Sequence, residues 1–66
     1  MSKLREELNR RGMNARNLAT ALGRNVALVT AVVRGDAKAT KPMIQQIGTA
    51  LEIDTTCFFD ERRFAR

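Results

Sequence analysis

Apolar residues along the chain recur every three to four positions, which is the spacing of one face of an α-helix. Strict alternation of apolar and polar residues, the pattern of a half-buried strand, does not occur, and the chain has no Asn-Gly or Asp-Gly hairpin turn. The pattern therefore predicts an all-α fold. Its apolar helix faces are formed by Leu4 and Leu8, by Leu18 and Leu22, and by Ile44, Ile47 and Leu51.

Helix-capping residues divide this pattern into five short helices. Ser, Thr, Asn and Asp accept hydrogen bonds from the free N–H groups at a helix start, and Gly commonly follows a helix end. We expect helices over about 2–11, 15–22 and 25–34, a fourth over about 40–51, and a short fifth helix carrying Phe58 and Phe59. The predicted N-caps are Ser2, Asn14, Asn25, Thr40 and Asp54.

The C-terminal part is expected to close the core. Phe58 is predicted to lie inside, with Cys57 beside it as a small buried hydrophobe. Two roles remain open for Phe59 or Phe64. Either could form a contact between two copies of the chain, or it could cover the end of the core. The tail, 60–66, is charged apart from Phe64 and is expected to be frayed.

The length of 66 residues fits a single domain over 1–66, with a small and marginally stable core. Cys57 is the only cysteine and histidine is absent, so neither a disulfide within the chain nor a metal site is expected. The sequence offers no nucleophile paired with a base and no glycine-rich phosphate loop, so neither an enzyme nor a cofactor is predicted. No apolar run approaches the ~20 residues of a membrane span. The start, MSKLREEL, lacks the apolar core of a secretory signal, which favours the cytoplasm.

The charge balance is basic. Lys and Arg number 12 against 7 Asp and Glu, which gives a net charge of +5 and a pI near 10.7. On a small chain this favours a polyanionic partner, most often nucleic acid. The alternative is a basic surface that serves only solubility.

Three stretches in register carry a family resemblance. They are MNARNLATALG at 13–23, GRNVALVTAVVRG at 23–35 and IGTALEIDTTCFF at 47–59. Together they resemble the Cro/phage-repressor type of helix-turn-helix DNA-binding domain, also called the xenobiotic-response-element family. The resemblance implies a compact, lambda-repressor-like domain of four to five helices, with its helix-turn-helix over about 15–34. In that family the third helix enters the major groove, commonly in a dimer.

Two family positions have lost their usual polar residues. Relatives often begin the second helix with a Gln that touches phosphate, and Ala15 stands there in this chain. Relatives also often pair an Arg of the first helix with a Glu near the end of the third, and these positions are Leu8 and Val33. Because both partners are apolar, no buried charge is left unpaired, and such a replacement is often neutral or stabilising.

The resemblance implies that the third helix turns Val29 and Val32 into the core and five other residues toward base edges. Reading a base well requires bidentate donors and acceptors, each good pair giving about 1–3 kcal/mol of discrimination. Only Asn25 and Thr30 offer polar atoms here, and the other three side chains can do no more than touch thymine methyl groups. The predicted base-reading face is Asn25, Val26, Ala27, Thr30 and Ala31.

A polar and basic rim is expected around the third helix, suited to phosphate oxygens on both sides of a groove. The alternative is a set of scattered, solvated charges. On the first helix, Glu6 and Glu7 are instead expected to pair with Arg10, Arg11 or Lys3. The predicted phosphate-contacting residues are Asn14, Arg16, Asn17, Arg24, Arg34, Lys38 and Lys41.

These features predict a sequence-specific DNA-binding transcriptional regulator, a minimal Cro-like repressor that acts by occupying its operator. Its expected partners are double-stranded DNA and a second copy of the chain, bound through the region of Phe59 and Phe64. An adaptor or anti-activator is the alternative, docking a regulatory protein through the apolar face of the third helix. An antitoxin would combine both roles.

Overall fold

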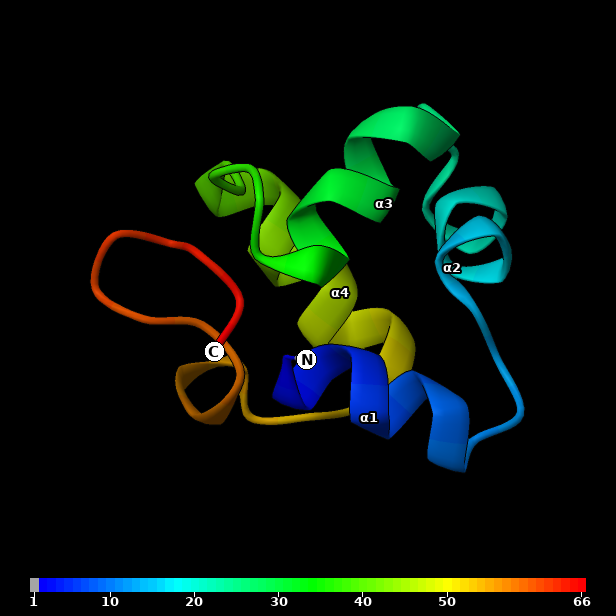
Figure 1. Cartoon of the computed structure of the whole chain (residues 1–66), viewed down its shortest axis with the longest axis horizontal. Helices are drawn as coiled ribbons and strands as arrows, with labels where there is room; N and C mark the ends of the chain where they lie inside the picture. Colours follow the sequence, from blue (N-terminus) through cyan, green and yellow to red (C-terminus); the bar gives the residue numbers. More distant parts are fainter. Residues whose placement is uncertain (1) are drawn as a thin grey trace.

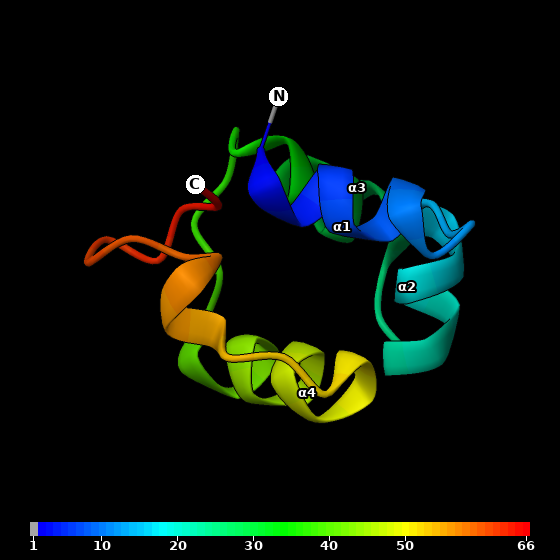
Figure 2. The same ribbon diagram turned by 90° about the horizontal axis from the view of Figure 1, so that it is seen from below.

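The computed structural model describes residues 2–66, which fold into four α-helices and one 3-10 helix (Figure 1). The elements are α1 (Lys3–Arg10), α2 (Ala15–Leu22), α3 (Val26–Arg34), α4 (Lys41–Leu51) and η1 (Thr55–Cys57). Helix α2 packs against α3 and α4, α1 packs against α3, and η1 packs against α4 (Figure 2). Within residues 2–66 the only β-type pairing is an isolated bridge between Phe59 and Ala65, so the all-α prediction is confirmed. None of the helices in this range is long and apolar enough to cross a membrane.

The helix boundaries follow from local side-chain chemistry. Each predicted N-cap side chain accepts a hydrogen bond from a backbone N–H in the first turn of its helix, or of η1 in the case of Asp54. At the other ends of α2 and α3, Gly23 and Gly35 adopt left-handed conformations with φ of 67° and 83°. Residues with a Cβ rarely adopt such angles, which explains why glycine stands at both positions. The predicted bounds of the first four helices are therefore confirmed to within about one residue.

The core draws on all four α-helices, and α3 contributes Val29, Val32 and Val33. The inward direction predicted for Val29 and Val32 is thus confirmed. The stripe predicted on α4 needs a correction, because Met43 is fully buried whereas Ile44 is only half-buried. The buried positions of α4 are four residues apart, at Met43, Ile47 and Leu51.

Three predictions for the C-terminal part are wrong. Phe58, predicted to lie inside, is half-buried at the edge of the core, whereas Phe59 lies in the core at 5% exposure, which fits the alternative that it covers the end of the core. Phe59 therefore has little surface left for the predicted contact with a second copy. Cys57 is exposed instead of buried, because η1 ends after a single turn and leaves that side chain outside.

The tail, 60–66, is also not frayed, because it is hydrogen-bonded along its length. The side chain of Asp60 accepts hydrogen bonds from the backbone N–H groups of Arg62 and Phe64, which folds the tail into a tight loop. The loop is then tied to the rest of the chain by backbone bonds, from Ala39 N–H to the Arg63 carbonyl, from Arg66 N–H to the Phe58 carbonyl and from Lys3 N–H to the Arg66 carbonyl.

Ser2 joins the start of α1 to the end of α3. Its hydroxyl oxygen accepts a hydrogen bond from the Arg5 N–H, which caps α1, and its hydroxyl group donates to the carbonyl of Val33. The residue is only 5% exposed, so water cannot readily replace either bond. A polar side chain at this position therefore fixes how α1 lies against α3.

We expect Ser2→Ala to lower the free energy of unfolding by about 2 kcal/mol, because a helix cap is lost and a buried carbonyl loses its donor. Chemical denaturation followed by circular dichroism measures the change. Thr20→Ala is the matched control, since the Thr20 hydroxyl donates to the Arg16 carbonyl on the exposed face of α2. Equal losses in the two variants would show that Ser2 has no special role.

Candidate functional site

Helices α2 and α3 are joined by a tight turn over Gly23, Arg24 and Asn25. The left-handed Gly23 reverses the chain, and the N–H groups of Gly23 and Arg24 donate back to carbonyls of the last turn of α2. Asn25 then caps α3 through a bond from the Leu28 N–H to its Oδ1 atom. The turn thus sets the start of α3 at a fixed angle to α2, along one edge of the molecule (Figure 1).

The first turn of α3 extends beyond the cover of the other helices. All residues from Asn25 to Leu28 are exposed, including Val26 at 39% and Leu28 at 44%. Thr30 and Ala31, further along α3, are half-buried. The five residues predicted for the outer face thus all reach the surface, and we call them, together with Leu28, the α3 face.

Leu28 belongs to this surface although the sequence did not predict it to be part of the base-reading face. It lies one helical turn before Val32, a core residue, so the helical period alone places it inward. Its exposure depends on how far α3 projects from α2, which is a property of the tertiary structure. Val26 and Leu28 are the two large hydrophobic side chains that remain exposed within residues 2–66.

The hydrogen-bonding capacity of the α3 face is small. The Oδ1 atom of Asn25 is occupied by its capping bond, so only the amide nitrogen of that side chain is free to donate. Thr30 adds one half-buried hydroxyl. A bidentate contact of the kind that asparagine makes to adenine needs both atoms of the amide. The face therefore offers two separate polar contacts among apolar side chains.

The basic residues near α3 differ in whether their side chains already form salt bridges or hydrogen bonds within the domain. Arg16, Lys38 and Lys41 are exposed and form no salt bridge within residues 2–66. Arg34 lies 3.6 Å from the Asp36 carboxylate, with both side chains largely exposed, which makes a weak pair. Arg24 is the exception, because its Nε donates to Gln46 Oε1 on α4 at 2.6 Å.

Asn14 and Asn17 form a capping box at the start of α2. Each side-chain oxygen accepts a hydrogen bond from the other residue's backbone N–H, at 2.8 and 3.0 Å. Both residues were predicted to contact phosphate. Their oxygens are committed to the helix start, which leaves the amide nitrogens as the groups able to donate to an anion.

The end of α1 holds a separate charge cluster. Glu7 accepts hydrogen bonds from Arg10 and Arg11, the latter at 2.6 Å from Nε, as expected for pairs three and four residues apart on a helix. The bonds from Arg11 and then Arg10 hold the pKa of the Glu7 carboxyl below its ordinary value. These two arginines are thus engaged on α1, away from the α3 face.

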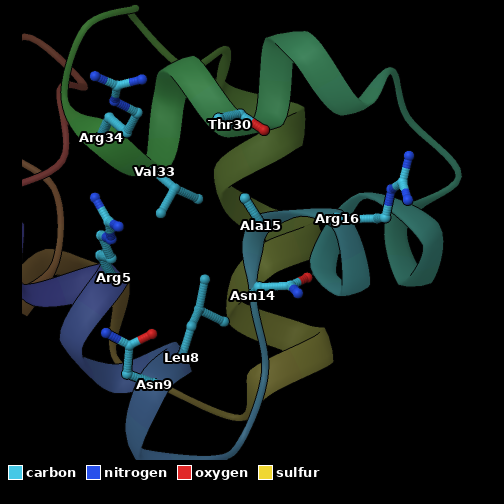
Figure 3. Close-up of a pocket in the computed structure, with 9 residues that line it drawn as sticks. All are labelled: Arg5, Leu8, Asn9, Asn14, Ala15, Arg16, Thr30, Val33 and Arg34. Atoms are coloured by element: carbon cyan, nitrogen blue, oxygen red, sulfur yellow. The ribbon is translucent and has the colours of Figure 1, made fainter.

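A pocket of about 520 Å³ opens between α1, α2 and α3 (Figure 3). We call it the three-helix pocket. Its floor is apolar and includes Leu8 of α1 and Val33 of α3, both almost fully buried, so neither position places a charge in the interior. Arg5 and Asn9 of α1 were not selected from the sequence as site residues, because only the tertiary structure brings them opposite α3. The polar lining residues are Arg5, Asn9, Asn14, Arg16, Thr30 and Arg34.

Comparisons of the chain with models of protein families, with curated proteins and with solved structures found no match.

The charge cluster on α1 makes a prediction about pH. Because the folded-state pKa of Glu7 is lowered, its interactions stabilise the fold above the ordinary value of 4.5 and are lost as pH falls through the lowered pKa. A titration of the Glu7 carboxyl by NMR should therefore have its midpoint below 4.5.

Arg11→Ala should move this midpoint back toward 4.5, since the bond from Arg11 is the largest cause of the shift. Arg16→Ala removes an arginine from α2 instead and should leave the midpoint unchanged. An unchanged midpoint in Arg11→Ala would contradict the assignment.

Proposed function

We propose that this chain is a sequence-specific DNA-binding transcriptional regulator of the Cro/phage-repressor type. In this proposal α2 and α3 form a helix-turn-helix, and α3 enters the major groove. The resemblance of the sequence over 4–59 supports the family, and the tight turn at Gly23 and the all-α fold are compatible with it.

One observation carries the proposal. The first turn of α3 is exposed, projects from the domain, and has unpaired cations on the elements around it. A helix that enters the major groove needs an uncovered face about as wide as the groove, and phosphates on either side need cations beside that face. Arg16 precedes the α3 face in the chain, on α2, and Lys38 and Lys41 follow it, in the loop after α3 and at the start of α4.

In this mechanism, affinity comes mostly from phosphate contacts, made by Arg16, Arg34, Lys38 and Lys41. Arg24 can join them through its Nη groups, because only its Nε is bonded to Gln46. Sequence preference comes from the Asn25 amide, the Thr30 hydroxyl and apolar contacts with thymine methyl groups, helped by the shape of the DNA. Repression follows from occupancy, as two copies of the chain cover an operator and exclude a competing protein.

The rival function is a protein-docking module. Val26 and Leu28 support it, because large exposed hydrophobic side chains in one helical turn are typical of protein interfaces. In this reading α3 would bind a regulatory protein, and the basic residues would serve solubility. An adaptor, an anti-activator or the antitoxin of a toxin pair would each fit.

Binding to fluorescent random-sequence duplex at several salt concentrations separates the two functions. A DNA-binding protein should lose affinity steeply as salt rises, with log K falling by about 0.9 for each phosphate neutralised per tenfold rise in salt. We expect a slope of several units. A docking module should bind duplex weakly even at low salt. That outcome would overturn the proposal and favour the rival.

Two substitutions separate base reading from phosphate binding. Asn25→Ser keeps an oxygen that can cap α3 but removes the amide donor, so it should reduce discrimination between matched and scrambled duplexes by up to about tenfold. Lys38→Ala should weaken binding to both duplexes by the same factor and reduce the salt slope by about one unit.

The matched duplex is obtained by selecting bound sequences from a random pool, and affinities are measured by fluorescence anisotropy. If each variant weakens both duplexes alike, Asn25 has no part in reading sequence.

A further inference from the structure

We propose that the three-helix pocket binds the phosphate group of a small organic phosphate, about the size of a mononucleotide. The pocket adjoins the α3 face and shares Thr30 with it, and α1 supplies its opposite wall (Figure 3). Three features support the proposal: the uncompensated charge, the free hydrogen-bond donors and the apolar floor.

The charge on the pocket is entirely positive. Arg5, Arg16 and Arg34 line it, and no carboxylate does. Arg5 and Arg16 form no salt bridge within residues 2–66, and the pair between Arg34 and Asp36 is long and exposed. In Figure 3 the Arg5 side chain points from α1 toward α3, while the guanidinium groups of Arg16 and Arg34 lie at the outer rim of the pocket. A cleft lined by one sign of charge attracts the opposite charge, and guanidinium groups match the geometry of phosphate.

Free donors lie at the same place. The backbone N–H groups of Ala15 and Arg16 begin α2, and they find no acceptor within residues 2–66, because the Asn14 cap satisfies only the Asn17 N–H. Both residues line the pocket. Unpaired N–H groups at the positive end of a helix favour an anion, and here they belong to residues of a pocket that also carries arginines.

The floor and the volume favour an organic phosphate over a bare ion. Leu8 and Val33 form the apolar floor but are only 1% and 2% exposed, and the half-buried Ala15 adds apolar surface to the wall of the pocket. Its volume of about 520 Å³ lies within the range of about 300–1,000 Å³ that is common for small-molecule sites. The replacement of the usual ion pair by Leu8 and Val33 creates this floor, and it leaves no acidic side chain there to repel the ligand.

The pocket shares residues with the predicted DNA contacts. Asn14, Arg16, Thr30 and Arg34 belong to both sets. A bound organic phosphate should therefore compete with duplex DNA, which would make operator binding responsive to a metabolite. This competition rests on the proposed function, whereas binding of the phosphate itself does not.

NMR titration of the full chain tests the pocket in the absence of DNA, with adenosine 5′-monophosphate, inorganic phosphate and adenosine as probes. We expect the monophosphate to shift the amide signals of Ala15 and Arg16 in a saturable way. Inorganic phosphate should shift the same signals more weakly, and adenosine should leave them in place. Shifts spread evenly over all basic surfaces would overturn the proposal.

Arg5→Ala should weaken binding of the monophosphate by about tenfold, the value expected for one hydrogen bond to a charged group. Its side chain is exposed and makes no hydrogen bond within residues 2–66, so the fold should be kept. Arg62→Ala removes the same charge from the exposed tail and should leave the affinity unchanged. If both variants lost the same affinity for the monophosphate, net charge alone would explain the effect, and the proposed pocket site would be rejected.

A last measurement, titration of duplex DNA into the same sample, separates the two proposals. Binding of the monophosphate without binding of duplex would keep the pocket and remove the DNA-binding function. Binding of duplex alone would do the reverse.

Discussion

The burial of Val29, Val32 and Val33 is the interaction on which the rest of the structure depends. These side chains commit one side of α3 to a core built with α1, α2 and α4, and a helix that commits one side necessarily turns the opposite side outward. The α3 face, its exposed first turn and the position of Arg34 on the pocket rim all follow from this single orientation. In a chain this short, few other contacts are available to hold the helix differently.

The apolar residues Leu8 and Val33 affect which basic side chains are available to an external partner. A buried ion pair there would hold an arginine inside the domain, whereas two hydrophobic side chains leave the interior neutral. The remaining cations are then free for an external partner, apart from those bound to Glu7, Asp36 or Gln46. The basic charge of the chain is thus concentrated on its surface, and three arginines are among the residues that line one pocket.

Local features of the fold could be predicted from the sequence, and features that depend on distant segments could not. The caps at Asn14 and Asn25 and the turn at Gly23 act within a few residues, so residue types alone reveal them. The burial of Phe59 rather than Phe58, the exposed Cys57 and the folded tail depend on where η1 ends and on bonds to residues far along the chain. The candidate site divides in the same way. The surface positions of α3 follow from its period, while Leu28, Arg5 and Asn9 enter only through the packing of α3 on its neighbours.

The backbone bond between Lys3 and Arg66 brings the two ends of the described chain together, and the bond from Ser2 to Val33 sets them near the last turn of α3. The exposed first turn lies at the opposite end of that helix, whose nine residues at 1.5 Å each span about 13 Å in all. A fluorescent label, an affinity tag or a second domain attached at either end would thus leave the molecule from one region. Such fusions could carry cargo without covering the first turn of α3.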